Sequence, residues 1–133
     1  MRILFLGDVV GISGCSKILN NLKSEIKKKN INFVIVNGEN SAEPGVGLTE
    51  EICKDFFNCG VDVITTGNHV WDQKEIMSFI EKENRLLRPH NLFEPSPGKG
   101  FEIYETYNHL KVGVLNLMGN VFMKKCEDVF EIS

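Results

Sequence analysis

Polar side chains that can bind a metal ion follow three apolar runs of the sequence. Each run is stopped by a glycine, and the residues at these points are Gly7-Asp8, Gly38-Glu39-Asn40 and Gly67-Asn68-His69. Carboxylate and amide oxygens mixed with an imidazole suit Mn, Fe or Zn ions, whereas purely carboxylate sites favour Mg or Ca. Two ions about 3.5–4 Å apart would clamp a phosphodiester and create a hydroxide nucleophile at neutral pH. The pattern therefore predicts a metal site that carries out hydrolysis.

Each of these residues, taken alone, has a simpler interpretation. Asp8, Glu39 or Asn40 could merely cap the helix that follows it, and a lone histidine is more often a hydrogen-bonded structural residue. Their coincidence at three strand ends favours a shared site. In such a site Glu39 can bridge two cations, and His69 is a candidate general acid because histidine exchanges protons near neutral pH.

The three apolar runs, residues 2–6, 33–36 and 61–66, are predicted to be buried strands. Apolar residues at helical spacing follow each run, so three strand–helix units occur in series. Such a series predicts an α/β fold with a parallel sheet, right-handed crossovers and helices on both faces. All three strand ends then lie at one edge of the sheet, where open α/β sheets place their ligands.

The predicted helices carry recognisable signals at their ends. The first ends in the basic cluster Lys27-Lys28-Lys29, which stabilises the exposed carbonyls of a helix end. Thr49 is expected to cap the second helix and Gly60 to close it. Asp72 followed by Glu75 fits a capping box for a third helix. The buried face of this third helix is expected to consist of Ile76, Phe79 and Ile80.

After a segment rich in proline and glycine, residues 101–107 and 111–117 are predicted to form a β-hairpin around Asn108-His109. We expect this C-terminal hairpin to extend one edge of the sheet in antiparallel fashion. No linker divides the chain, and its 133 residues, 42% of them hydrophobic, suit a single domain over residues 1–133.

The composition argues against several other classes of protein. A net charge of −3 does not suit a protein that coats duplex nucleic acid. No apolar run is long enough to cross a membrane, and neither a dinucleotide-binding fingerprint nor a phosphate-binding loop is present. The four cysteines lack metal-binding spacing, so we expect free thiols and a cytoplasmic location. These cysteines are Cys15, Cys53, Cys59 and Cys126.

Several stretches resemble the YmdB-like metallophosphoesterase family. In chain order they read MRILFLGDVVG, FVIVNGENSA, GVDVITTGNHVWD, RLLRPHN, PGKG and VGVLNLMGNVFM. The most specific part is NGEN followed by TTGNHVWD at this separation. The resemblance implies half of a calcineurin-like αββα sandwich. It also implies a phosphodiesterase that hydrolyses 2′,3′-cyclic nucleotides or similar phosphodiesters with two metal ions, Fe or Mn.

The resemblance also implies roles for individual residues. Asp8, Glu39, Asn40 and Asn68 fall on metal-ligand positions, with Glu39 as the bridging carboxylate, and His69 falls on the position of the proton donor. Trp71 and Asp72 match the motif too, but packing explains the tryptophan and helix capping explains the aspartate. Arg85 and Arg88 could contact a substrate phosphate by bidentate hydrogen bonds, and a structural ion pair explains them equally well.

The resemblance covers only the N-terminal half of a family member. The missing half supplies a further histidine and a Thr-His-x-His segment that complete both metal sites. Three hypotheses follow: a metal-dependent phosphodiesterase, an inactive or split fragment of such an enzyme, and a nucleotide- or RNA-binding regulatory module. The expected partners are a small phosphodiester or RNA, and not a membrane. A second copy of the chain is also expected, because an uncovered sheet edge invites self-association.

Overall fold

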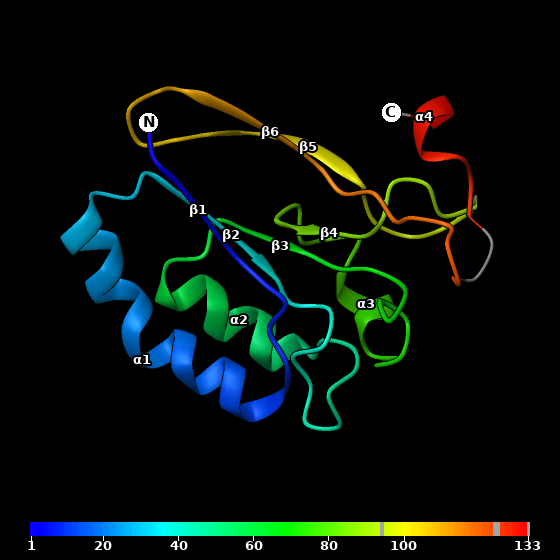
Figure 1. Cartoon of the computed structure of the whole chain (residues 1–133), viewed down its shortest axis with the longest axis horizontal. Coiled ribbons are helices and arrows are strands. Elements are labelled where there is room, and N and C mark those ends of the chain that lie inside the picture. The colour runs from blue at the N-terminus through cyan, green and yellow to red at the C-terminus, as the bar shows by residue number, and fades with distance from the viewer. Residues whose placement is uncertain (94, 124–125, 133) are drawn as a thin grey trace.

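In the computed structural model, residues 1–93, 95–123 and 126–132 are described, and a parallel sheet forms the centre of the molecule (Figure 1). Its strands are β1 (Ile3–Leu6), β2 (Phe33–Asn37), β3 (Val63–Thr65) and β4 (Leu86–Leu87). They pair in the order β1-β2-β3-β4, and every pairing is parallel. The predicted parallel sheet is therefore confirmed. Its fourth strand was not predicted, because two residues give no periodic signal.

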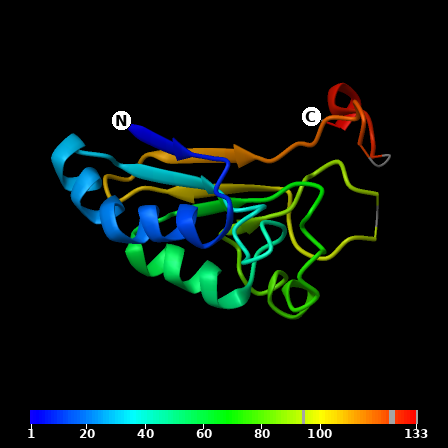
Figure 2. The same cartoon turned by 60° about the horizontal axis from the view of Figure 1, so that its bottom comes forward.

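Helices α1 (Gly11–Lys29) and α2 (Glu50–Cys59) both cover the same face of the sheet (Figures 1 and 2). The one-turn helix α3 (Ile76–Phe79) follows β3, and α4 (Val129–Ile132) lies near the C-terminus. The prediction of helices on both faces is wrong. Because the strand order repeats the chain order, each right-handed crossover returns on the same side of the sheet.

The ends of α1 and α2 follow from their local sequence. Thr49 Oγ1 accepts a hydrogen bond from the backbone N–H of Ile52 at 3.3 Å, which confirms the predicted N-cap of α2. Gly60 ends α2 with φ of 109°, a left-handed conformation that a side chain would strain. Asn30 ends α1 in the same left-handed region, after the basic last turn. Local chemistry thus fixes where both long helices stop.

Strands β5 (Phe101–Glu105) and β6 (Lys111–Leu115) form the predicted antiparallel hairpin, each shorter than expected. The hairpin does not extend the sheet; it is a separate two-stranded sheet that packs on the face without helices (Figure 2). Val112 and Val114 of β6 are buried against the sheet face that the helices leave uncovered, and Tyr104 of β5 packs beside them. This second core consists of Phe33, Val63, Leu87, Val112 and Val114.

The hairpin layer is tied to the sheet by polar contacts as well. Asn116 Nδ2 donates hydrogen bonds to the backbone oxygens of Thr66 at 2.8 Å and Leu87 at 3.1 Å. The ring of Tyr104 lies 5.8 Å from the ring of Phe33, centroid to centroid. Among the described residues, no helix is long and apolar enough to span a membrane. All four cysteines are buried and free.

Candidate metal centre

Strands β1, β2 and β3 end at one edge of the sheet, as the sequence predicts. Their register pairs Leu6 with Val36, and Asn37 with Thr65, so the residues that follow each strand start at the same level. The polar side chains after these strands therefore lie at the same edge, although Asp8 and His69 are far apart in the chain. Their individual contacts define a candidate site.

Asp8 and Asn40 are in direct contact. Asn40 Nδ2 donates a hydrogen bond of 2.7 Å to Asp8 Oδ2. The backbone holds the two segments together beyond the strands, because the N–H of Val9 donates to the oxygen of Asn37 at 3.1 Å and the N–H of Gly11 donates to the oxygen of Asn40 at 2.9 Å. With its Nδ2 bound to Asp8, Asn40 leaves its amide oxygen available to a cation.

Glu39 is held by the segment that follows β3. Its Oε1 accepts a hydrogen bond from the backbone N–H of His69 at 3.1 Å. A Cβ atom added at Gly67 would collide with both carboxylate oxygens of Glu39, so only glycine admits this carboxylate at the end of β3. The glycine of the Gly67-Asn68-His69 sequence thus has a specific structural purpose, which is to make room for Glu39.

His69 is oriented by Asp72. Nδ1 of the histidine lies 2.6 Å from Oδ2 of the aspartate, and both side chains are partly exposed. The predicted capping box is therefore wrong. Helix α3 starts only at Ile76, and its N-cap residue Glu75 makes no side-chain hydrogen bond to the helix end. The carboxylate of Asp72 contacts His69 instead. Sequence reasoning missed this pair, although the spacing of three residues was a usable signal.

Asn68 also lies at this edge, in the segment that follows β3, and it is half-buried. Within the described part of the chain its side chain has no hydrogen-bond partner, so its amide oxygen is free to bind a cation. The structure therefore brings together Asp8 with Asn40, and Glu39 with the segment that carries Asn68 and His69.

The two arginines have structural partners. Arg88 is buried, and its guanidinium donates to the backbone oxygens of Pro89 at 2.9 Å and Pro97 at 3.2 Å. It thereby fixes the loop after β4, and no described contact joins it to the residues after β1–β3. Arg85 pairs with Glu83 through two hydrogen bonds of 3.0 Å and lies 3.8 Å over the ring of Phe57. Contact of Arg88 with substrate phosphate stays a prediction.

The donor chemistry at the strand ends fits part of a metal site. Asp8 and Glu39 offer carboxylates, and Asn40 and Asn68 offer amide oxygens, which are donors that Mn and related cations accept. Across the described ranges, however, no three His, Cys, Asp or Glu side chains gather closely enough to hold an ion. The set therefore fits the oxygen-donating portion of a metal site and lacks the imidazoles that usually strengthen one.

A groove between the sheet and the hairpin begins beside this edge. Its polar lining includes Asn37 and Thr65, the last residues of β2 and β3, together with Asn116. Its apolar lining consists of Phe5, Ile35, Gly113, Val114, Leu115 and Leu117. The groove is open and measures about 570 Å³, a volume in the range of small-molecule sites.

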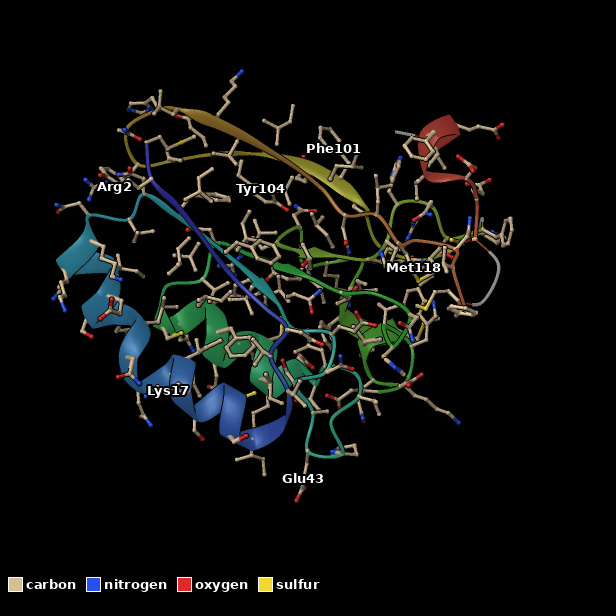
Figure 3. The ribbon with its side chains drawn as sticks, in the orientation of Figure 1. Arg2, Lys17, Glu43, Phe101, Tyr104 and Met118 are labelled. Carbon is tan, nitrogen blue, oxygen red and sulfur yellow. The ribbon has the colours of Figure 1, made fainter. Side chains whose placement is uncertain are left out.

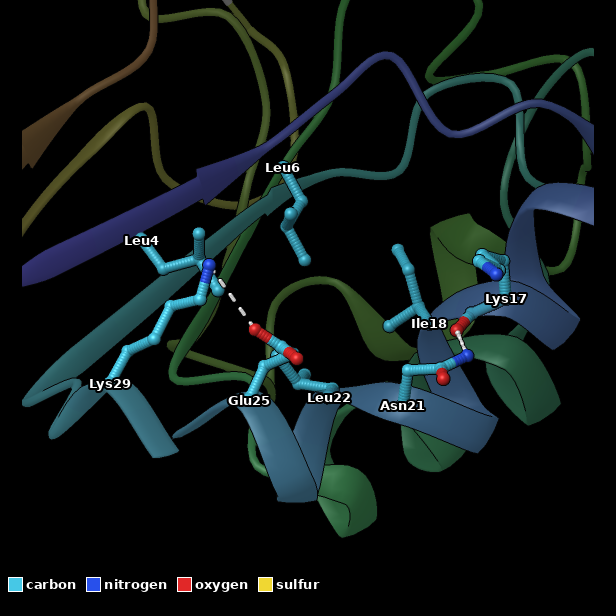
Figure 4. Close-up of a pocket in the computed structure, with 8 residues that line it drawn as sticks. All are labelled: Leu4, Leu6, Lys17, Ile18, Asn21, Leu22, Glu25 and Lys29. Carbon is cyan, nitrogen blue, oxygen red and sulfur yellow. Dashed lines mark hydrogen bonds and ion pairs between the residues drawn. The ribbon is translucent and has the colours of Figure 1, made fainter. Parts of the chain in front are cut away.

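A second groove lies between β1 and α1, on the helix side of the sheet (Figure 4). Leu4, Leu6, Ile18 and Leu22 form its apolar lining. The polar groups at its rim bind one another: Glu25 pairs with Lys29 at 3.2 Å, and Asn21 donates to the backbone oxygen of Lys17 at 2.7 Å. Glu25, the carboxylate of this lining, is thus already paired, so the candidate site is the strand-end edge.

The fold is similar to that of two solved structures. A hypothetical protein from Thermus thermophilus superposes with a TM-score of 0.91 at 35% sequence identity, over 99% of this chain and 50% of that chain. A structure described as a novel phosphatase from Mycoplasma pneumoniae gives a TM-score of 0.89 at 33% identity, over 99% of this chain and 48% of that one. These similarities confirm the mixed α/β fold with its parallel sheet and hairpin.

Sequence similarity leads to the same group of proteins. The chain is 44% identical over 130 residues to the 2′,3′-cyclic-nucleotide 2′-phosphodiesterase of Bacillus subtilis (strain 168), an alignment that covers 98% of this chain and 48% of that protein. The chain thus spans about half the length of the relatives it matches. The family model described as YmdB-like protein matches residues 4–133. The chain belongs to the YmdB-like protein family.

Proposed function

We propose that this protein is a metal-dependent phosphodiesterase that hydrolyses 2′,3′-cyclic nucleotides or similar phosphodiesters by a two-metal mechanism with Fe or Mn. The observation that carries the proposal is the convergence of Asp8 with Asn40, and of Glu39 with the segment at His69, at one sheet edge. The phosphodiesterase named among its relatives supports the choice of reaction. The groove beside the strand ends offers a place for the nucleoside part of a substrate.

In this proposal Asp8, Glu39, Asn40 and Asn68 would hold the metal ions, with Glu39 as the shared carboxylate. The bound ions would supply Lewis-acid stabilisation of the phosphoryl oxygens and activate the attacking water. Hydrolysis bonds the oxygen of water to phosphorus, breaks one phosphorus–oxygen bond of the diester and adds a proton to the leaving oxygen. The protein must therefore hold a proton donor close to that oxygen.

His69 is the proposed donor of this proton. Because Nδ1 lies 2.6 Å from the carboxylate of Asp72, the proton on Nδ1 is held in that hydrogen bond. The other ring nitrogen, Nε2, is then the atom that exchanges a proton with the leaving oxygen. Asp72 acts as a positioning residue, since it fixes the ring and its tautomer without touching the substrate.

A second candidate is an incomplete half of such an enzyme, which needs another polypeptide for turnover. Two observations favour it: the chain matches about half the length of its relatives, and the described residues hold no group of three His, Cys, Asp or Glu donors. In this version the strand-end residues supply the oxygen donors, and a separately made second half supplies the imidazoles.

Metal content tests the proposal directly. We would purify the chain from medium supplemented with Mn and Fe and measure the ratio of metal to protein, with Glu39→Gln alongside. Glu43→Gln is the matched control, because Glu43 is exposed on the outer side of the same loop (Figure 3). A ratio near the two ions of a dinuclear site, lost in Glu39→Gln and kept in Glu43→Gln, is the expected result.

Activity separates the two candidates. Cleavage of a cyclic nucleotide by the chain alone, abolished by Asp8→Asn, is expected of a complete enzyme. Activity that appears only after a second half is added identifies an incomplete one. Equal activity in wild type, Asp8→Asn and Glu39→Gln would contradict both candidate functions, because the reaction would then not depend on the strand-end carboxylates.

A further inference from the structure

The segment that carries His69 belongs to no helix or strand. It runs from the end of β3 to the start of α3 at Ile76, and its turns are closed by single backbone hydrogen bonds, such as that from the N–H of Asp72 to the oxygen of His69 at 3.1 Å. The side chains of His69 and Asp72 are 34% and 41% exposed. A partly exposed pair contributes little energy by itself, so the backbone that carries it must set its geometry.

Gln73 ties this segment to the loop between β2 and α2. Its Nε2 donates a hydrogen bond of 3.0 Å to the backbone oxygen of Val46, in a partly buried contact. The loop lies beside the segment in the fold (Figures 1 and 2). It comes closest at Gly47, where an added Cβ atom would lie 2.7 Å from Cγ of Gln73 and 3.5 Å from Cβ of Asp72. The glycine therefore lets the loop support the residue that orients His69.

Glu75 ties the same segment to the start of α2. Its Oε1 accepts a hydrogen bond of 2.7 Å from the backbone N–H of Glu50, the first residue of α2. Thr49 accepts from the N–H of Ile52, so two side chains together satisfy free N–H groups at this helix end. The sequence pattern placed Glu75 at the start of the third helix, but its carboxylate caps α2 instead.

These contacts join the two parts of the candidate site. The loop follows Glu39, the proposed bridging carboxylate, and the segment carries His69, the proposed proton donor. Near β3 the two are joined by the hydrogen bond from the N–H of His69 to Glu39. Gln73 and Glu75 join them again further along the chain. The turn that begins at His69 is thus held at both ends by contacts within residues 39–75.

We propose that Gln73 and Glu75, called the turn clamp, are positioning residues for the proposed reaction. The clamp fixes the ring of His69 relative to the metal donors and touches neither substrate nor metal. A reacting group must be held within about 0.5 Å of its productive position. A partly exposed pair on an irregular segment reaches that precision only with support from neighbouring contacts. The inference rests on the proposed function, in which His69 is the proton donor.

Motion of the His69 ring tests the clamp without any substrate. In the chain prepared without metal, ¹³C relaxation of this ring should show an ordered side chain. Gln73→Met keeps the length of the side chain and removes its donor, so the order parameter of the ring should fall below about 0.6, the range of flexible groups. Lys74→Met, at an exposed neighbouring position, is the matched control. Gln73→Glu, which also cannot donate, replaces Gln73→Met if circular dichroism shows that variant to be unfolded.

Glu75 allows a test by conservative replacement. Glu75→Met removes the acceptor for the N–H of Glu50 and should loosen the ring of His69 in the same way. Glu75→Gln keeps an oxygen that can accept this bond and should leave the ring as in wild type. Glu51→Met is the control, because Glu51 is exposed in the first turn of α2 and its replacement removes the same charge at the same helix end.

Kinetics connect the clamp to the reaction. Gln73→Met should lower kcat for a cyclic nucleotide about tenfold and leave KM unchanged. Cleavage of a diester with a nitrophenolate leaving group should be unaffected, since that group departs without a proton. Because the clamp acts through Asp72, the same change should cost little in a chain that already carries Asp72→Asn. Absence of cleavage by the wild type would contradict the proposed function, whereas the ring measurement would still decide the clamp.

The outcomes are distinct. A ring that loosens in Gln73→Met and Glu75→Met, and stays ordered in Glu75→Gln and in both controls, supports the proposal. A ring that is mobile in the wild type overturns it, as does a ring that stays ordered in Gln73→Met. Lower stability in denaturant with an unchanged ring would show that these residues serve folding alone, which also overturns the positioning role.

Discussion

The contact between His69 and Asp72 gives each side chain a defined task. Asp72 is the fourth residue of the turn that begins at His69, and its carboxylate reaches back to Nδ1 of the histidine at 2.6 Å. The backbone N–H of the same histidine holds Glu39 at 3.1 Å. His69 thus contacts Asp72 through its ring and holds Glu39, the proposed bridging carboxylate, through its backbone. The side chain of Asp72 contacts the ring, so a change at Asp72 should affect chemistry more than folding.

Replacement of Asp72 by asparagine is expected to lower kcat about 10–100-fold, the usual cost of removing a group that orients a site residue. The effect should be large for a cyclic nucleotide and small for a diester with a nitrophenolate leaving group, which departs without a proton. Asp55→Asn, on the exposed side of α2, is the control. In the chain alone, ¹⁵N shifts of the His69 ring at one fixed pH should show the tautomer becoming mixed. Equal losses on both substrates would contradict the positioning role.

The thiol of Cys53 provides a test of packing at a single residue. Burial, followed by the nearby charge of Glu83, raises its pKa to about 12. A raised pKa means less thiolate, so at pH 8 only about one thiol in ten thousand is reactive. Iodoacetamide labelling followed by mass spectrometry should therefore leave Cys53 unmodified in the folded chain and modify it readily in denaturant. Labelling of the folded chain at the denatured rate would show that α2 does not pack as described.

At the scale of elements, the end of β3 controls the candidate site through Gly67. Gly67→Ala places a methyl group where the carboxylate of Glu39 lies, so Glu39 must leave its position. We expect metal content to fall to the level of Glu39→Gln, while the far-UV circular dichroism stays that of a folded chain. Gly119→Ala is the control, because an added Cβ there meets nothing within 4 Å. Full metal content in Gly67→Ala would mean that Glu39 is not a ligand.

The elements that the sequence predicted correctly are those with local causes. Thr49 and Gly60 delimit α2 through hydrogen bonds and a backbone angle that lie within the helix ends themselves. The capping box at Asp72 was predicted wrongly, because its carboxylate had a competing partner in His69 that spacing alone did not reveal.

Placement of the hairpin depended on distant contacts and was also predicted wrongly. The spacing of two strands around Asn108-His109 predicts a hairpin, but it does not say which surface the hairpin meets. The sheet face left bare by α1 and α2 decided the outcome. For the candidate site, the residue types and the shared edge could be predicted, since the ends of parallel strands coincide. The contacts among these residues could not, because they depend on side-chain positions.

At the scale of the whole molecule, two cores of unequal size hold three layers together. Among the residues that the structure describes, the core between the helices and the sheet contains sixteen buried residues, whereas the core between the sheet and the hairpin contains five. Since hydrophobic stabilisation grows with the apolar area buried, the hairpin layer is the weaker attachment. The candidate site belongs to the sheet, so it should survive motions of the hairpin.

Native-state hydrogen exchange can measure this difference. Amides of β5 and β6 are expected to exchange at least about tenfold faster than those of β2 and β3, because the hairpin can open without unfolding the larger core. Val114→Ala removes buried methyl groups from the smaller core, so it should speed exchange in the hairpin and leave β3 unchanged. Ile103→Ala, at an exposed position of β5, should change neither rate. If β5 and β3 exchange together in every variant, the two cores unfold as one unit, and the hairpin is then as integral to the fold as the sheet that carries the site.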